Sequence, residues 1–350
     1  MSEKKIAKSG AADEYSEFSR ILAHYNLSPP SECKLVAGGT RNRNYMLLVD
    51  SQKYFLRCRN QAFCNIQSIR FDHELMRHLR SKGILAPCPI LTASGESWLD
   101  LDDQIYELFT YIEAKGVYHQ HDTDQLKNAG KALGQFHQAV FDFQPGVEKS
   151  KFRIDPPEKA AARIKELVSR SDDPNAGKLG DYIMKQIDRV KQQLPDALFF
   201  ELPSLIVHGD YHPANVKYNG KQVAGFFDLD WASRQPRIYD LSYGLLYFVA
   251  LRENDIDGSD IYSLTQTCKP DIHRSSLFVS SYLNYIDLQP FEIDLLPIMM
   301  RINWICCRTD GSHKVPPEDQ WRFFSIDIKQ PLRWLDKNET NFTQTLKDLL

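Results

Sequence analysis

The chain has 350 residues, of which 42% are hydrophobic and 25% charged, as is usual for globular proteins. The 43 Lys and Arg residues against 46 Asp and Glu residues give a net charge of −3, which argues against a protein that binds nucleic-acid phosphates or an anionic membrane. None of the seven cysteines has CxxC spacing, and no apolar run approaches the ~18 residues of a membrane span. With a polar first segment and scattered thiols, the sequence predicts a cytoplasmic protein of two domains or lobes.

Strand signals dominate the first third of the sequence. Short runs rich in apolar and aromatic residues alternate with polar turns, as is typical of antiparallel strands. The predicted strands cover residues 33–37, 45–49, 54–58, 98–101 and 104–111. A helix is predicted over residues 66–81, because apolar side chains recur on one face and Gly83 ends the pattern.

The sequence beyond these strands is predicted to be mainly helical. An amphipathic helix begins near a cap at Asp122-Thr123 and runs to about Val140. We therefore expect an α+β fold in two parts. Residues 1–110 would form a strand-rich N-terminal lobe, and residues 111–350 a larger, mainly helical lobe.

The densest group of polar residues follows an apolar run that reads as a buried strand, at residues 205–207. Asp210 and Asn215 lie five residues apart directly after this run, with His212 between them. Polar side chains at a strand end are well placed to form a site.

A hairpin is predicted to bring a further carboxylate to the same place. Asn219-Gly220 stands between two short apolar runs, which is a strong signal for a type I′ turn. In that register Asn215 would face Ala224, and the second strand would lead back to Asp228. Oxygen ligands of Asp210, Asn215 and Asp228 are therefore expected to converge.

This set of residues matches the needs of phosphoryl transfer. Hard oxygen ligands suit Mg²⁺, which binds few protein side chains and keeps substrate phosphates in its coordination shell. A further carboxylate can accept the proton of an acceptor hydroxyl. Protein kinases place Asp and Asn five residues apart in one loop and a metal-binding Asp further along the chain.

Three segments together carry a resemblance: HGDYHPAN from residue 208, FFDLDWA from residue 226 and RIYDL from residue 237. They resemble the superfamily of aminoglycoside phosphotransferases, choline kinases and type II homoserine kinases, which have a bilobal protein-kinase-like fold. The resemblance implies that Asp210 is the catalytic base and that Asn215 and Asp228 hold magnesium. It also implies that His212 contacts the γ-phosphate and that Asp240 braces the catalytic loop.

The same resemblance implies a nucleotide site in the N-terminal lobe, with ATP between the lobes. A glycine turn would cover the phosphates, Arg57 would reach the α- and β-phosphates with Glu74 as its ion-pair partner, and the backbone of residues 107–112 would bind adenine. The nucleotide-binding residues implied are Gly38, Gly39, Arg57, Glu74, Glu107 and Phe109. An ordinary structural ion pair is the alternative for Arg57 and Glu74.

Three other functions are compatible with parts of the pattern. His208, Asp210 and His212 could form a metal hydrolase site, although this leaves Asn215 and Asp228 unexplained. The chain could also be a non-catalytic nucleotide-binding protein or a protein kinase of the same fold. We expect an ATP- and Mg²⁺-dependent kinase of a small hydroxylated substrate: homoserine, an amino alcohol, a sugar or an aminoglycoside. The identity of the acceptor and the oligomeric state stay open.

Overall fold

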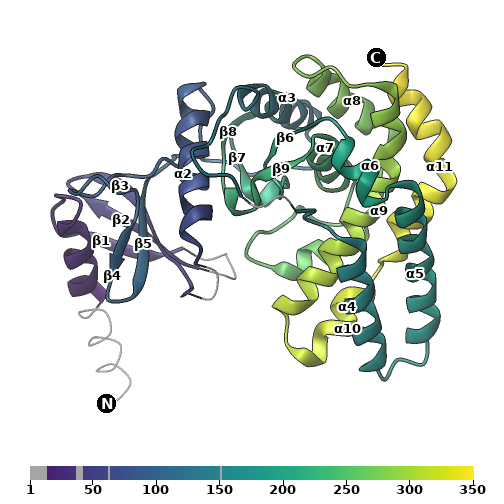
Figure 1. Cartoon of the computed structure of the whole chain (residues 1–350), viewed down its shortest axis with the longest axis horizontal. Helices are drawn as coiled ribbons and strands as arrows, with labels where there is room; N and C mark the ends of the chain where they lie inside the picture. Colours follow the sequence, from purple (N-terminus) through teal and green to yellow (C-terminus); the bar gives the residue numbers. More distant parts are fainter. Residues whose placement is uncertain (1–13, 37–41, 62–63, 150–151) are drawn as a thin grey trace. The chain divides into compact units, whose positions relative to one another are not determined.

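The computed structural model describes residues 14–36, 42–61, 64–149 and 152–350 (Figure 1). Its contacts divide the chain into two compact units. The sheet unit comprises Met1–Glu113 with Gln144–Glu148, and the helical unit comprises Ala114–Phe143 with Lys149–Leu350.

The sheet unit contains one antiparallel sheet of five strands in the order β1-β2-β3-β5-β4 (Figure 1). The strands are β1 (Glu32–Leu35), β2 (Arg43–Val49), β3 (Gln52–Cys58), β4 (Leu99–Leu101) and β5 (Gln104–Thr110). Its helices are α2 (Ile66–Ser81) and a helix at residues 14–23. The five predicted strands and the predicted helix over residues 66–81 are confirmed, whereas the helix at residues 14–23 was not predicted.

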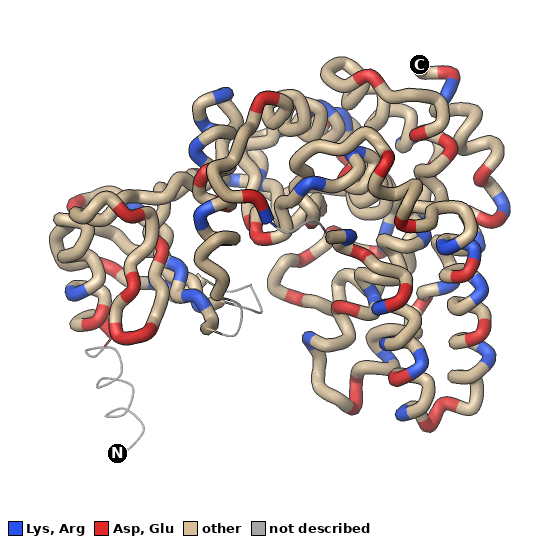
Figure 2. The backbone as a smooth tube through the Cα atoms, in the orientation of Figure 1, with Lys and Arg blue, Asp and Glu red and all other residues tan. Residues whose placement is uncertain are grey.

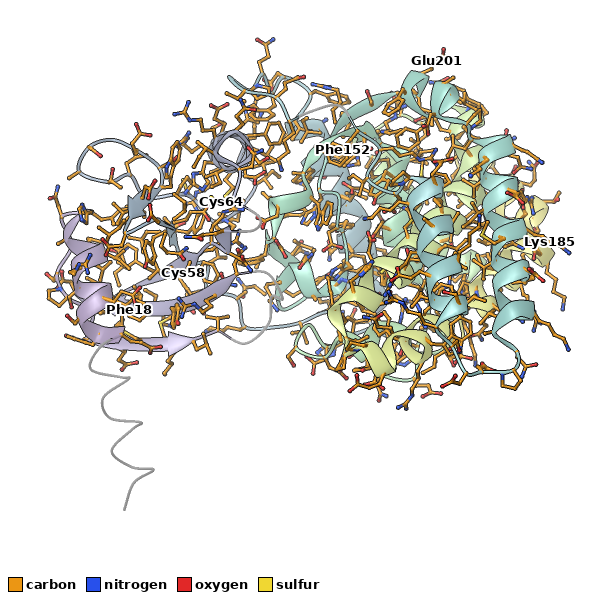
Figure 3. The ribbon with its side chains drawn as sticks, turned by 60° about the horizontal axis from the view of Figure 1, so that its bottom comes forward. Phe18, Cys58, Cys64, Phe152, Lys185 and Glu201 are labelled. Carbon is orange, nitrogen blue, oxygen red and sulfur yellow. The ribbon has the colours of Figure 1, made fainter. Side chains whose placement is uncertain are left out.

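The two faces of the sheet are covered differently, because successive side chains of a strand point to opposite faces. In β5, Leu108 belongs to a hydrophobic core with Phe18 of the first helix, and Cys58 of β3 lies in the same core (Figure 3). Phe109 points to the other face, where its ring packs edge-on against His73 of α2 at 5.4 Å. One face therefore buries apolar side chains, and the other carries polar groups of α2.

The helical unit contains nine helices and four short strands among its described residues. The helices are α3 (Thr123–Ala139), α4 (Pro157–Ser169), α5 (Ala176–Gln193), α6 (Asp196–Glu201), α7 (Ile238–Gly244), α8 (Ile272–Leu283), α9 (Pro290–Gly311), α10 (Gln320–Ser325) and α11 (Lys329–Lys347). The strands are β6 (Ser204–Val207) paired with β9 (Ser233–Pro236), and β7 (Val216–Asn219) paired with β8 (Gln222–Phe226). Helix α3 starts where predicted, because the Asp122 side chain accepts hydrogen bonds from the N–H groups of Asp124 and Gln125.

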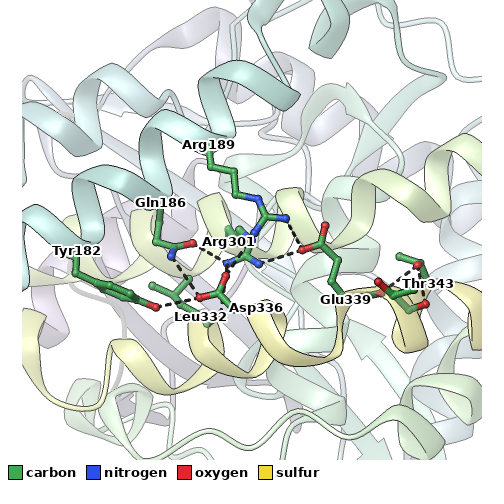
Figure 4. Close-up of polar contacts among 9 residues, drawn as sticks. Tyr182, Gln186, Arg189, Arg301, Leu332, Asp336, Glu339 and Thr343 are labelled. Carbon is green, nitrogen blue, oxygen red and sulfur yellow. Dashed lines mark hydrogen bonds and ion pairs between the residues drawn. The ribbon is translucent and has the colours of Figure 1, made fainter.

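Charged groups hold three of these helices together. Arg301 of α9 is fully buried and forms ion pairs with Asp336 (2.9 Å) and Glu339 (3.1 Å) of α11 (Figure 4). It also donates a hydrogen bond to Gln186 of α5 (2.7 Å). The other charged residues of α5 and α11 mostly lie on the surface, and acidic and basic residues alternate along both helices (Figure 2). Lys185 is one of them and projects from α5 (Figure 3). Removing one partner of a buried pair leaves an uncompensated charge, so Arg301 fixes how α9 packs.

The seven cysteines are all free thiols, and Cys58, Cys268 and Cys306 are buried. Burial raises the pKa of Cys58 to about 12. Within the described part of the chain, no helix is both long and apolar enough to cross a membrane.

Candidate active site

The loop after β6 brings together three of the predicted site residues. A single 3₁₀ turn, Pro213–Asn215, returns the chain so that the Asn215 side chain reaches Asp210. Its Nδ2 donates hydrogen bonds to the Asp210 carboxylate (3.0 Å) and to the Asp210 backbone carbonyl (3.0 Å). His212 Nε2 lies 3.4 Å from the same carboxylate oxygen, Oδ2. The predicted contact between Asp210 and Asn215 is thus present.

Asp210 is held as a carboxylate. Burial alone would raise its pKa, but His212, His208 and Lys314 together lower the pKa of Asp210 to about 2. Its side chain is still 26% exposed. Among the described residues, only Oδ2 of this carboxylate has a hydrogen-bond or ion-pair partner, so Oδ1 can accept a hydrogen bond from a ligand hydroxyl.

Asp240 braces this loop, as the resemblance implied. Its buried carboxylate accepts hydrogen bonds from the backbone N–H groups of His208 (2.6 Å) and Gly209 (2.9 Å). His137 of α3 lies 3.1 Å from Asp240, and the other nitrogen of its ring lies 2.9 Å from the Tyr282 hydroxyl of α8. Three helices therefore fix the position of the loop backbone.

His208 supports the backbone instead of binding a ligand. Its Nδ1 accepts a hydrogen bond from the Asp210 N–H (3.3 Å), and its Nε2 lies 3.0 Å from the Phe227 carbonyl. Across the residues that the structure describes, no three His, Cys, Asp or Glu side chains form a group that could hold a metal ion. Because both ring nitrogens of His208 are engaged with the backbone, the metal hydrolase alternative loses one of its three proposed ligands.

Gly209 is required by the close packing of this loop. Its φ of +82° is in the left-handed region, and a Cβ atom there would lie 2.4 Å from the Trp231 carbonyl oxygen. The segment after Asp228 therefore packs directly against the backbone of the catalytic loop.

The hairpin that leads to Asp228 has a different register from the predicted one. Gly220 and Lys221 are the central turn residues, and of these only Gly220 has a positive φ (+61°), so the turn is not type I′. An irregularity between Lys217 and Tyr218 shifts the pairing further. The prediction that Asn215 faces Ala224 was therefore wrong.

The corrected register brings the predicted metal ligands closer together. The Phe227 N–H donates a hydrogen bond to the Asn215 carbonyl (2.9 Å), and Asp228 is the next residue. Asp228 is exposed and has a left-handed backbone, with φ of 57° and ψ of 62°. Aspartate adopts this conformation more often than most residues, and such strain gathers at functional sites.

The donor set fits a hard divalent cation. The Asn215 amide nitrogen is engaged with Asp210, which leaves its Oδ1 for a cation, and Asp228 adds a carboxylate. Two protein oxygens are the sparse set that suits Mg²⁺, whose remaining positions are filled by water and phosphate oxygens.

The sheet unit holds the other predicted residues. Arg57 is largely buried near the end of β3, with its guanidinium 5.9 Å from the Phe109 ring. Gly38 and Gly39 lie outside the described residues. Glu74 accepts a hydrogen bond from the Gly146 N–H (2.7 Å). Its pairing with Arg57 stays a prediction.

The acidic side chain next to β3 is Glu107 of β5. It is fully buried and pairs with Arg59 (2.6 and 3.2 Å) and His73 (2.8 Å). Burial would raise its pKa, but His73, Arg59 and Arg57 together lower the pKa of Glu107 to about 2. Arg59 and His73 were not predicted; the spacing of Arg57 and Arg59, which puts alternate residues on one face of a strand, was an available signal.

Comparisons with known proteins give a consistent result. A model of the phosphotransferase enzyme family matches residues 32–266. The chain is 25% identical over 285 residues to a homoserine kinase of Parvibaculum lavamentivorans, with 81% of each chain covered. It is 28% identical over 241 residues to a homoserine kinase of Neisseria meningitidis serogroup B, which covers 69% of this chain and 74% of that protein.

Solved structures share the fold. An amicoumacin kinase in complex with AMP-PNP, Ca²⁺ and Ami superimposes with a TM-score of 0.63 at 14% identity, covering 99% of this chain and 94% of that one. A microcompartment-associated aminopropanol kinase gives a TM-score of 0.64 at 14% identity, covering 93% and 98%. The predicted α+β, protein-kinase-like fold is confirmed.

Proposed function

Because the chain belongs to the phosphotransferase enzyme family, we propose that it is an ATP- and Mg²⁺-dependent kinase that phosphorylates a hydroxyl group of a small metabolite. The observation that carries this proposal is the Asp210 carboxylate. Asn215 and His212 hold one of its oxygens, Oδ2, while Oδ1 has no partner among the described residues and can accept a hydrogen bond from a substrate hydroxyl.

In this proposal Asp210 Oδ1 accepts the hydrogen bond of the acceptor hydroxyl and takes up its proton as the new O–P bond forms. A carboxylate with a pKa of about 2 is a weak base, so orientation of the hydroxyl is the larger part of its contribution. His212, beside this carboxylate, contacts the γ-phosphate.

Asn215 Oδ1 and the Asp228 carboxylate are the residues proposed to hold Mg²⁺. The ion, when bound, neutralises charge on the phosphates of ATP. The backbone hydrogen bond between Phe227 and Asn215 holds the backbone of Asp228 next to Asn215 before any ligand arrives, which lowers the cost of assembling the site.

Within the sheet unit we propose Arg57 as a cation for ATP phosphates, with Gly38 and Gly39 as the turn that covers them. Glu107 and Phe109 pair with Arg57 and Phe55 inside the sheet, so within the predicted segment 107–112 the backbone beyond β5, at residues 111–112, is proposed to bind adenine. Buried Glu107 also supports Arg57, because it keeps a negative charge next to that guanidinium.

Homoserine is the first acceptor to test, since the two curated relatives described above are homoserine kinases. The experiment supplies Mg-ATP with homoserine, an amino alcohol, a sugar, an aminoglycoside or a generic protein, and follows ADP and the phosphorylated product. We expect transfer to one of the small acceptors. Absence of transfer to all of them, or efficient transfer to the protein, would contradict the proposal.

A variant tests the metal site in the same assay. Asp228→Asn should raise the Mg²⁺ concentration needed for half-maximal turnover by at least about tenfold, and added Mg²⁺ should partly restore the rate by mass action. Asp188→Asn, an exposed change on α5, is the matched control and should keep the wild-type Mg²⁺ dependence.

A further inference from the structure

A row of three tyrosines starts beside the catalytic loop. Tyr239, Tyr243 and Tyr247 are four residues apart on α7 and its π-helical continuation, Leu245–Val249, so they share one face. Neighbouring ring centroids are 5.4 and 5.5 Å apart. The Tyr247 ring lies 5.8 Å from the ring of His212.

The other end of the row is a second carboxylate. Asp155 precedes α4, is 5% exposed, and accepts a hydrogen bond from the Tyr239 hydroxyl (3.0 Å) through Oδ2. No other hydrogen bond or ion pair to Asp155 is formed by the described residues. The second oxygen, Oδ1, therefore has no hydrogen-bond partner among the described residues.

The charged groups around Asp155 do not neutralise it. Arg153 and Lys159 lower the pKa of Asp155 through their positive charge, but each forms its ion pair with another carboxylate. Arg153 pairs with Asp196 (3.0 Å), and Lys159 pairs with Asp310 (3.0 Å). The pKa of Asp155 is raised to about 8, mainly by burial. The hydrogen bond from Tyr239 lowers this pKa, and the negative charge of Asp310 raises it further. A buried carboxylate without a cation in contact is costly and calls for a functional reason.

The middle tyrosine is the one with an open hydroxyl. Tyr239 donates to Asp155, and Tyr247 donates to the Cys307 thiol. Tyr243 is 7% exposed, and its hydroxyl has no hydrogen-bond partner in the described part of the chain. Burial raises the pKa of Tyr243, and the negative charges of Asp155 and Asp210 both act on its hydroxyl. Tyr243 therefore stands in the row between Tyr239, which bonds to Asp155, and Tyr247, whose ring neighbours His212.

We propose that Asp155 anchors a protonated amine of the phosphate acceptor, with the Tyr243 hydroxyl as a neighbouring contact, so that the acceptor hydroxyl is directed to Asp210. The inference rests on the proposed function and narrows its acceptors to hydroxylated amines. An ammonium group supplies the positive charge that Asp155 lacks and donates up to three hydrogen bonds. A sugar without an amine offers Asp155 no such charge.

Binding measured without nucleotide separates this inference from the kinase proposal. Calorimetric titration uses L-homoserine and 1-amino-2-propanol as amine probes, and 4-hydroxybutanoate and 1,2-propanediol as analogues that lack the amine. We expect wild type to bind an amine probe at least about tenfold more tightly than its analogue, and Asp155→Asn to lose this preference. Affinity of wild type for the amine should also rise as the pH is raised toward 8, because the ammonium group requires an ionised Asp155.

Turnover supplies the second readout. Asp155→Asn should raise the KM for the amine acceptor by about 10- to 100-fold while the KM for ATP stays unchanged, and Tyr243→Phe should give a smaller rise without loss of thermal stability. Asp188→Asn is the control. If no probe prefers the amine form, or if Asp155→Asn retains the preference, the inference is overturned. Amine-selective binding through Asp155 without phosphate transfer would overturn the kinase proposal and leave the amine site standing.

Discussion

Glu107 of the sheet unit and Asp210 of the helical unit are carboxylates with the same pKa, about 2 in each case. Their surroundings differ. Glu107 has no exposed surface, and both of its oxygens are taken by Arg59 and His73. Asp210 is 26% exposed and uses one oxygen for protein contacts.

The difference shows that a depressed pKa does not by itself mark a catalytic acid or base. Perturbed groups gather at active sites, but structural ion networks perturb them equally. What distinguishes Asp210 is a lone pair that the protein leaves for a ligand. The comparison therefore predicts that substitution of Asp210 costs activity and that substitution of Glu107 costs stability.

Asp210→Asn provides the largest expected effect. The amide keeps the size of the side chain and an oxygen for Asn215, but it cannot take up a proton. We expect kcat to fall by about 10²- to 10⁴-fold with little change in the thermal midpoint or in Mg-ATP affinity. Steady-state kinetics and a melting curve on the same preparation measure both. A fall of less than tenfold would mean that the reacting hydroxyl does not meet Asp210.

Glu107→Gln should act on stability. It leaves Arg59 buried without its charged partner, and breaking a buried pair costs about 3–5 kcal/mol of unfolding free energy. Urea denaturation of the purified variant measures this loss. Under conditions where the variant is folded, kcat should remain within a few-fold of wild type, and the loss of support for Arg57 should appear in the KM for ATP. A loss of kcat like that of Asp210→Asn would place Glu107 in the catalytic machinery.

The pH dependence of stability sharpens the same contrast. The folded pKa of Glu107 is about 2 against an ordinary value of 4.5, so its stabilisation is present above about pH 4.5 and is lost as the pH falls toward 2. The difference in unfolding free energy between wild type and Glu107→Gln should therefore shrink across this interval. A difference that stays constant with pH would show that the glutamate charge is not the cause.

The smallest effect is expected for a surface pair in the sheet unit. Arg20 and Asp102 are 2.6 Å apart, yet 57% and 73% of their side chains are exposed. Solvent screens such pairs, so Arg20→Ala should leave the urea midpoint within experimental error. A clear shift of the urea midpoint would show that the sheet unit is destabilised by any loss of charge. The loss of stability in Glu107→Gln could then not be assigned to the buried pair.

Local patterns predicted the strands, α2, α3 and the catalytic loop, because these depend on side-chain spacing, caps and short motifs. The first helix was missed although Phe18, Ile21, Leu22 and Tyr25 have helical spacing and are buried. Strand β9 could not be found in this way, because Ser233–Pro236 lacks alternating apolar residues and is a strand only through its pairing with β6.

Long-range contacts account for the remaining errors. The hairpin register depended on a turn at Gly220-Lys221 in place of Asn219-Gly220, and on an irregularity between Lys217 and Tyr218 that leaves no local signal in the sequence. The pairing of Glu107 with Arg59 and His73 joins two strands and a helix, and Asp155 meets Tyr239 across 84 residues. Such polar contacts are selected by the folded environment, so spacing along the chain does not reveal them.

The buried free thiols give each unit its own chemical reporter of opening. Alkylating reagents react with thiolates, and a thiol with a pKa of about 12, such as Cys58, is almost entirely protonated at neutral pH while the sheet unit is closed. Cys268 and Cys306 are buried in the helical unit, and burial raises the pKa of both. The rates at which these thiols are alkylated, read by peptide mass spectrometry, therefore count how often each unit unfolds, and a nucleotide or acceptor that slows only one set identifies the unit it binds.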